Sequence, residues 1–215
     1  MNVVLYYGSG SPYAWRVQLA LEHKAIDYER KVLSFSAGDT RKPEFLRLNP
    51  RHRVPVLVHD EFVLYESNAI VEYLDEAFAG RGAPLFPTGT EARALTRRLI
   101  LEVDNYLDKA SEGVWKQAFA TEPARRDAQV VRTGEQDLRE EFSLFTTALR
   151  GPYLVGELSA ADFALYPALA VLRRCERRLE GFSLVALLTP ELRVWMSAIE
   201  ALPFFETTVP PHWKS

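Results

Sequence analysis

The sequence is poor in features that would each mark a particular class of protein. Its 215 residues include one cysteine, Cys175, which excludes an intramolecular disulfide and a cysteine-rich metal site. The four histidines lack the spacing of metal ligands. No apolar run approaches the ~20 residues of a membrane span, and the first residues lack the basic and apolar segments of a signal peptide. The sequence therefore predicts a cytoplasmic protein without a bound metal or a membrane span.

Signals for nucleic acids and nucleotides are also missing. The net charge is −3 and the isoelectric point about 5.9, which argues against a nucleic-acid surface. The turn Gly8-Ser9-Gly10 lacks the third glycine of a dinucleotide-binding loop. Hydrophobic residues make up 47% of the chain, which is enough for a sizeable core. These features favour a soluble globular protein.

The chain changes character at a segment rich in glycine and proline. Before it, short apolar strands alternate with helices: we expect strands at 2–7, 26–33, 54–58 and 62–65, and helices beginning at Ser11, Pro43 and Ser67. After it, only helical patterns occur, at 91–119, 124–149, 160–172 and 192–201. We therefore expect an α/β domain at residues 1–79, a linker at 80–90 and an all-helical domain at 91–215.

Two local signals refine the expected helical domain. Ser159 and Asp162 have the spacing of a capping box at the start of the helix 160–172. This helix is strongly apolar and should lie in the core, which makes Asp162 a structural residue. The tail 207–215 contains Pro210, Pro211 and Trp213, and we expect it to lie over the surface.

Two motifs in the first domain together describe a receptor for a small acidic peptide. A proline at the first residue of a strand marks an edge or a cis bond that turns the backbone outward, so Val54-Pro55 could offer Val54 for pairing with an extended peptide. Glu66 and Ser67 begin an apolar-periodic helix, whose N-terminus attracts anions such as a carboxylate. One motif would thus hold peptide backbone and the other a carboxylate.

In this order and spacing, Asn49-Pro50, Val54-Pro55 and Glu66-Ser67-Asn68-Ala69-Ile70 resemble the cytosolic glutathione transferase family. The resemblance extends over the whole chain. It implies a thioredoxin-like α/β N-terminal domain followed by an all-α helical domain, and glutathione as cosubstrate. It also implies a homodimer, a detoxification role, and attack of the glutathione thiolate on a small hydrophobic electrophile.

Within this resemblance, Ser11 occupies the position of the catalytic serine in serine-type classes. Ser11-Pro12-Tyr13 is similar to the tau-like type, and Trp15-Arg16-Val17 is similar to the zeta type. A hydroxyl donor and the N–H groups at a helix start both favour a thiolate. Tyr7 is the alternative, since tyrosine-type classes place their tyrosine at the end of the first strand.

The other site residues also follow from the resemblance. Glu66 and Ser67 would hold the γ-glutamyl amine and carboxylate, and Val54, before Pro55, would pair with the cysteinyl backbone. His52 and Arg53 would contact the glycine carboxylate, with Arg53 favoured as a permanent cation. The electrophile pocket would lie between the domains, with Tyr106, Trp115, Phe119 and Tyr166 as candidate lining residues.

Two other functions remain open on the same fold. One is a glutathione-dependent cis–trans isomerase of zeta type, although Pro12 and Tyr13 stand where that motif has serine and cysteine. The other is a non-catalytic binding protein, which the intact Ser11, Glu66 and Ser67 disfavour. A thiol–disulfide reductase is disfavoured because residue 11 is not cysteine.

Overall fold

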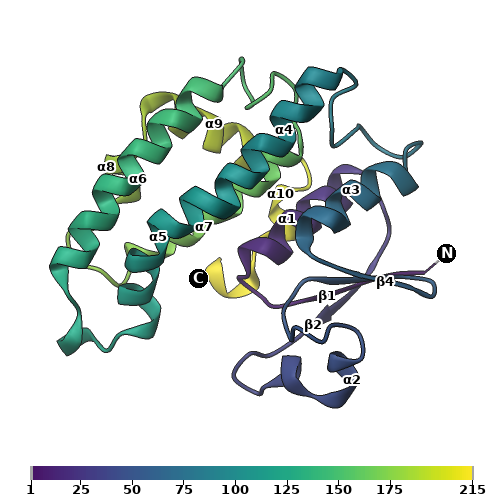
Figure 1. Cartoon of the computed structure of the whole chain (residues 1–215), viewed down its shortest axis with the longest axis horizontal. Coiled ribbons are helices and arrows are strands. Elements are labelled where there is room, and N and C mark those ends of the chain that lie inside the picture. The colour runs from purple at the N-terminus through teal and green to yellow at the C-terminus, as the bar shows by residue number, and fades with distance from the viewer. Residues whose placement is uncertain (1, 215) are drawn as a thin grey trace. The chain divides into compact units, whose positions relative to one another are not determined.

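The computed structural model describes residues 2–214 and divides the chain into two compact units (Figure 1). The first unit comprises the residues up to Phe86 together with those from Pro203 onward, and the second comprises Pro87–Leu202. No helix in the described part of the chain combines the length and apolar character needed to cross a membrane.

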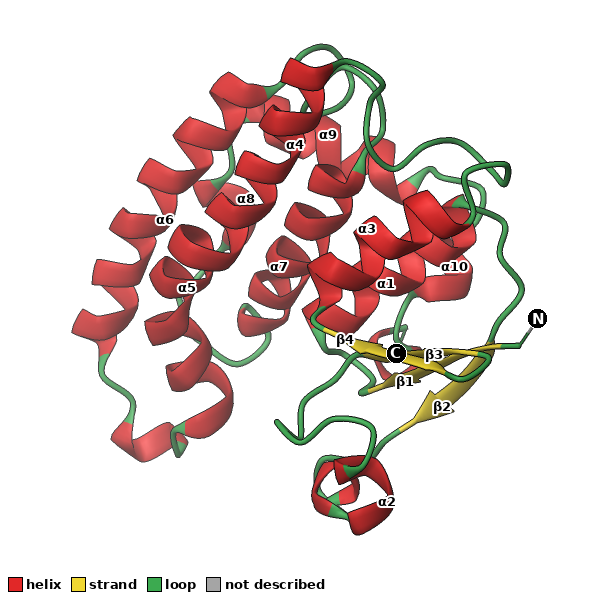
Figure 2. Ribbon diagram, turned by 45° about the vertical axis from the view of Figure 1, so that its right-hand side comes forward, coloured by secondary structure: helices red, strands yellow, loops and turns green. Residues whose placement is uncertain are grey.

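The first unit is built around a mixed four-stranded sheet (Figure 2). Its strands are β1 (Val3–Tyr7), β2 (Glu29–Val32), β3 (Val56–His59) and β4 (Phe62–Tyr65), in the spatial order β2-β1-β3-β4. β1 pairs with β2 in parallel through the crossover helix α1 (Pro12–His23), and both remaining pairings are antiparallel. The expected strand 54–58 begins two residues later than the sequence suggested, after a cis Val54–Pro55 bond.

Helices complete the first unit. α1 packs against α3 (Ser67–Ala77), and every residue of α1 from Ala14 to Leu21 is buried. The short helix α2 (Pro43–Leu46) follows a 3₁₀ turn at Asp39–Arg41. This order of elements confirms the predicted thioredoxin-like domain.

The second unit is entirely helical in its regular structure, as predicted. Its helices are α4 (Thr90–Glu102), α5 (Asp108–Trp115), α6 (Ala128–Ala148), α7 (Ala160–Cys175), α8 (Leu184–Leu187) and α9 (Pro190–Glu200). The single helix expected at 91–119 is divided by a π-helical turn at Val103–Leu107 and followed by another at Lys116–Ala120. Each π turn comprises only five residues, which is too short a segment to be distinguished from an α-helix by apolar spacing.

The start of α7 shows why Asp162 is structural. Its carboxylate is fully buried and accepts hydrogen bonds from the backbone N–H of Ser159 at 2.9 Å and of Leu154 at 3.0 Å. It also accepts the Ser159 hydroxyl at 2.9 Å and the indole N–H of Trp195 on α9 at 2.8 Å. Asp162 therefore joins the α7 cap, the preceding loop and α9 at one point.

The chain beyond α9 differs from the expected domain division. The helical domain was expected to continue to residue 215, but residues from Pro203 onward belong to the first unit. They form α10 (Phe205–Thr208) and a 3₁₀ turn at Pro211–Trp213. The reason is a set of side-chain contacts with α1: the buried indole N–H of Trp15 donates to the Thr208 hydroxyl at 2.8 Å.

Candidate functional site

Strand register brings the segments that carry the predicted site residues of the first unit to the same end of the sheet. Val56, the first paired residue of β3, lies opposite Tyr6 on β1 and opposite Tyr65 on β4. The end of β1, which leads to Ser11, therefore lies beside the start of β3, which follows Val54-Pro55. The end of β4, which leads to Glu66 and Ser67, lies on the other side of that start.

Ser11 occupies the N-cap of α1, as predicted. Its hydroxyl oxygen accepts the backbone N–H of Ala14 at 3.3 Å, and Pro12 occupies the first helical turn. A hydroxyl has one donor and two acceptor positions. Ser11 can therefore cap the helix and still donate its own proton to an anion at the helix start.

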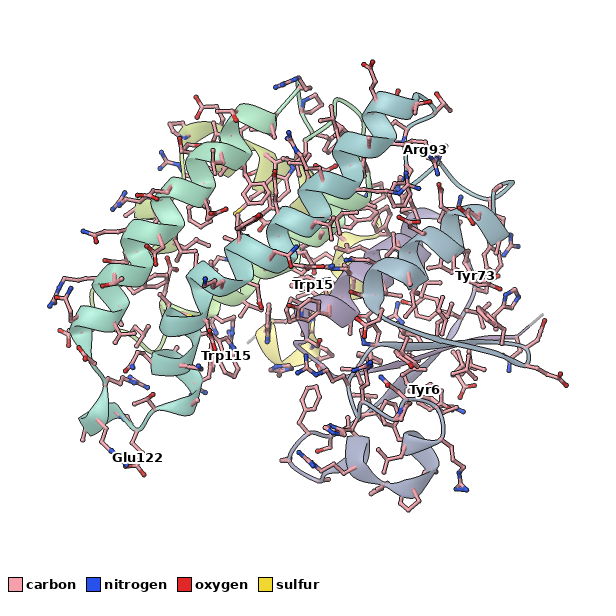
Figure 3. The ribbon with its side chains drawn as sticks, in the orientation of Figure 1. Tyr6, Trp15, Tyr73, Arg93, Trp115 and Glu122 are labelled. Carbon is pink, nitrogen blue, oxygen red and sulfur yellow. The ribbon has the colours of Figure 1, made fainter. Side chains whose placement is uncertain are left out.

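Tyr7 and Tyr6 face opposite sides of the sheet, as neighbouring strand residues do. The ring of Tyr6, which is labelled in Figure 3, lies 6.2 Å from the ring of Phe45 on α2, and its centroid lies 5.4 Å from Lys31 Nζ. Tyr7 instead lines a cavity together with Trp15 of α1 and residues of the C-terminal segment. Tyr7 thus lies on the α1 side of the sheet and stays an alternative hydroxyl for the site.

The loop before β3 is held by Asn49. This buried side chain donates from Nδ2 to the carbonyl of Arg53 at 2.8 Å and accepts the N–H of Arg51 at 2.9 Å. The backbone N–H of His52 donates to the Asn49 carbonyl at 3.0 Å, and His52 has a left-handed φ of 47°. The side chains of His52 and Arg53 are exposed, so both can reach an anionic ligand.

The junction between β4 and α3 has an unusual backbone. Glu66 is exposed and has a φ of 72°, a region that non-glycine residues rarely occupy. Its carbonyl accepts the N–H of Ile70 at 3.0 Å, which begins α3, and Ser67 is buried in the first turn. Such conformations often accompany binding sites, because the surrounding structure must hold them in place.

Arg16 lies near the proposed site, although the sequence pointed to it only as part of the motif Trp15-Arg16-Val17 and indicated no role for it in binding. Its buried guanidinium donates to the Asn68 side-chain carbonyl, next to Ser67, and its Cζ lies 5.1 Å from the Tyr13 ring centroid. Arg16 therefore links the first turns of α1 and α3 and contributes a permanent positive charge near both. A cationic residue among the apolar residues of a buried helix was the signal for it.

In the second unit, the aromatic residues proposed for the electrophile pocket fall into two groups. Tyr106 is 60% exposed and lies in the first π-helical turn. Trp115, labelled in Figure 3, is 44% exposed and directly precedes the second π-helical turn. Phe119 lies in the second π turn, its ring 6.1 Å from that of Trp115. π turns in helices are frequent at functional sites.

Tyr166 differs from these residues. It is fully buried, and its hydroxyl donates to Glu200 at 2.8 Å and accepts from Arg173 at 3.1 Å. Burial raises the pKa of this phenol. In this conformation Tyr166 connects α7 to α9 and has no free surface for a substrate.

Comparisons with known proteins found related sequences and structures that cover both units of the chain. The glutathione S-transferase N-terminal domain model matches residues 10–77, and the glutathione S-transferase C-terminal domain model matches residues 106–203. Glutathione S-transferase A of Pleuronectes platessa is 30% identical over 99% of this chain and 93% of its own length. Glutathione S-transferase 3 of Zea mays is 32% identical over 93% of this chain and 89% of its own. A glutathione S-transferase structure from the Antarctic clam Laternula elliptica superimposes with a TM-score of 0.85 at 28% identity, covering 100% of this chain and 95% of that one.

Proposed function

Because the chain belongs to the glutathione S-transferase family, we propose that it catalyses attack of the glutathione thiolate on small hydrophobic electrophiles, with Ser11 stabilising the thiolate. The proposal is carried by the convergence of Ser11, Val54 and Ser67 at one end of the sheet. This convergence follows from the pairing of Val56 with Tyr6 and with Tyr65. The residues proposed to bind the thiol, the peptide backbone and the carboxylate of glutathione thus lie close together.

The chemistry asked of Ser11 is modest. A thiol with a pKa near 8.5 is only a few per cent ionised at pH 7. Lowering that pKa by two units requires about 2.7 kcal/mol of preferential stabilisation of the anion. A hydrogen bond from the Ser11 hydroxyl, together with the positive N-terminus of α1, can provide an effect of this size. The buried cation of Arg16 lies one turn into the same helix and favours the anion as well.

The remaining contacts divide glutathione among three segments. The backbone of Val54 would pair with the cysteinyl residue, while the first turn of α3 at Ser67 would accept the γ-glutamyl carboxylate and Glu66 its amine. Arg53 and His52 would bind the glycine carboxylate. The exposure of Glu66, His52 and Arg53 and the ordered loop around Asn49 support this assignment.

For the electrophile, we propose Tyr106 and Trp115 as contact residues. Both expose apolar ring surface on the second unit, and both lie at π-helical turns. The buried Tyr166 has a structural role instead, because its hydroxyl donates to Glu200 and thereby connects α7 with α9. Binding of a hydrophobic electrophile would bury the exposed rings of Tyr106 and Trp115, and the removal of apolar surface from water would favour binding.

We also propose a homodimer. Phe62 on the edge strand β4 is 47% exposed and its ring lies 5.0 Å from that of Tyr73 on α3. An edge strand with exposed apolar residues favours association with another chain, and a two-fold dimer is the commonest arrangement.

The proposal is tested by incubating the protein with glutathione and three substrate types: an alkylating electrophile, a cis-maleyl compound and a disulfide. Mass spectrometry should detect the thioether conjugate with the electrophile. If the protein instead isomerised the maleyl compound without net conjugation, its activity would be that of a glutathione-dependent isomerase and not that of a transferase. If calorimetry also detected no glutathione binding at about 10 mM, far above the usual range of substrate constants, the glutathione site itself would be refuted.

A further inference from the structure

The C-terminal segment 203–214 is fastened to the first unit at two points. The Thr208 hydroxyl accepts the buried indole N–H of Trp15 at 2.8 Å. The Thr207 carbonyl accepts the Arg30 guanidinium at 2.9 Å. The ring of Phe205 lies 6.1 Å from that of Trp15. These contacts fix the beginning of the segment against α1 and β2.

The end of the segment contacts the turn that precedes Ser11. His212 Nδ1 lies 3.1 Å from the Ser9 hydroxyl, and the Trp213 ring meets the Trp15 ring edge-on at 5.4 Å. Gly10 has a φ of 87°, and a methyl group added there would lie 3.3 Å from Trp213 Nε1 and 3.4 Å from His212 Nε2. The glycine thus provides both a left-handed backbone and room for the two side chains.

This turn carries Ser11. The backbone N–H of Ser11 donates to the Gly8 carbonyl at 3.0 Å, so the turn sets the direction in which the Ser11 side chain leaves the backbone. A rotation at Gly10 would move the Ser11 hydroxyl away from the helix axis. The position of the hydroxyl therefore depends on what holds Gly8–Gly10.

The space beneath the segment shows that the core does not hold this turn on all sides. A cavity of about 50 Å³ is lined by Tyr7, Ser9, Gly10, Trp15, Gln18, Arg30 and the residues from Thr207 to Pro211. Ligand pockets usually measure about 300–1,000 Å³, so a tripeptide does not fit here. Because the turn borders this cavity, its conformation depends more strongly on the contacts from His212 and Trp213 than it would in a closely packed core.

We propose that His212 and Trp213 are positioning residues of the thiol site, which hold the Gly8–Ser11 turn so that the Ser11 hydroxyl points at the thiol of bound glutathione. This inference rests on the proposed role of Ser11. Glutathione binding itself is proposed to use Val54 and Ser67, which lie on other segments of the chain. The segment therefore acts on the ionisation of the thiol and on turnover, and only weakly on affinity.

The test compares His212→Ala and Trp213→Ala with the conservative variants His212→Asn and Trp213→Phe in the full-length protein. Asparagine can still form a hydrogen bond with Ser9, and phenylalanine keeps a ring against Trp15. The readouts are the glutathione dissociation constant by calorimetry and the pKa of the bound thiol from thiolate absorbance near 240 nm. Steady-state kcat and KM are measured with the electrophile that the wild-type protein conjugates.

We expect each alanine variant to raise the pKa of the bound thiol and to lower kcat at neutral pH about three- to tenfold, as misplacement of a catalytic group does. The dissociation constant should change less than about twofold, because the backbone and carboxylate contacts remain. The conservative variants should restore most of the wild-type thiol pKa.

Two results would overturn the inference: an unchanged thiol pKa in both alanine variants, or a parallel loss of affinity and turnover. If an alanine variant does not fold, Ser9→Ala removes the His212 contact from the other side and should raise the thiol pKa in the same direction. An unchanged thiol pKa in Ser9→Ala would then count against it. The proposed function would be refuted by different results: the wild-type protein binds no glutathione, or the pKa of the bound thiol equals that of free glutathione.

Discussion

The side-chain amide of Asn49 donates a hydrogen bond to the backbone carbonyl of Arg53, 2.8 Å away. The same side chain accepts the N–H of Arg51, so one buried residue fixes both ends of the loop before Val54. The loop carries no regular structure of its own, and its shape depends on these side-chain bonds. The residues proposed to bind the peptide backbone and the glycine carboxylate are therefore placed by a residue that does not touch the ligand.

We predict that Asn49→Ala weakens glutathione binding. The Arg53 carbonyl and the Arg51 N–H lose their partner, which should lower the free energy of unfolding by about 1–3 kcal/mol. The KM for glutathione should rise about tenfold while kcat changes less, because the contacts to be lost are binding contacts. Steady-state kinetics and urea unfolding measure the two effects.

Asn49→Asp is the matched control. It keeps the oxygen that accepts from Arg51 and loses the donor to Arg53. A KM close to that of the wild type would assign the effect to the Arg51 contact, which the aspartate keeps. A wild-type KM in both variants would show that the loop keeps its shape without Asn49.

Local signals in the sequence were sufficient for much of the fold and for part of the candidate site. Ser11 and Pro12 mark a helix start because a hydroxyl cap and a fixed φ suit that position in any protein, and the structure shows both. The hairpin of β3 and β4 follows from two short apolar strands, and the start of α3 at Ser67 from the apolar periodicity of the helix. Such features depend on residues within a few positions of one another.

Contacts between distant residues could not be predicted in this way. Nothing near Trp213 indicates that it packs against Trp15, almost two hundred residues earlier, and the tail was assigned to the wrong unit. Tyr166 has the same composition signal as Tyr106, but only tertiary packing buries the first and exposes the second. Burial is set by the assembled helices, which apolar periodicity alone describes too coarsely.

A second prediction concerns the stability of the helical unit. Asp162→Ala removes the acceptor for Ser159, Leu154 and Trp195 and leaves their buried donors unpaired. The free energy of unfolding should fall by about 3 kcal/mol or more, because each buried donor that is left without a partner costs about 1–3 kcal/mol. Asp137→Ala, at an exposed position of α6, should change it by less than about 0.5 kcal/mol. Equal effects of the two variants in urea unfolding would contradict this role of Asp162.

A third prediction concerns the single cysteine. Cys175 is fully buried at the end of α7, and burial raises the pKa of its thiol to about 12. A group with so high a pKa is almost wholly protonated at pH 8, and the thiolate is the reactive form. Iodoacetamide at pH 8 should therefore leave the native protein unlabelled for hours and modify it promptly in denaturant. Rapid labelling of the native protein, followed by mass spectrometry, would show that α7 opens at its end.

The fourth prediction concerns the role of Ser11. Ser11→Ala removes the hydroxyl and one helix cap, at a stability cost of about 1 kcal/mol. Glutathione affinity should change little, since Val54 and Ser67 remain. Turnover at neutral pH should fall about ten- to a hundredfold, which corresponds to about 1.4–2.7 kcal/mol of lost thiolate stabilisation. Ser11→Thr keeps a hydroxyl at the cap and should retain most of the activity.

The pH dependence separates Ser11 from its alternative, Tyr7. In Ser11→Ala the thiol pKa rises, so the pH–rate profile should move to higher pH and part of the lost turnover should return where the thiol ionises unaided. Tyr7→Phe deletes the other hydroxyl and keeps the ring in the cavity beside Trp15, so its profile should stay close to that of the wild type. A shifted profile in Tyr7→Phe and an unshifted one in Ser11→Ala would make the enzyme tyrosine-type. If neither profile moved, the backbone N–H groups at the start of α1 would stabilise the thiolate without help from either hydroxyl.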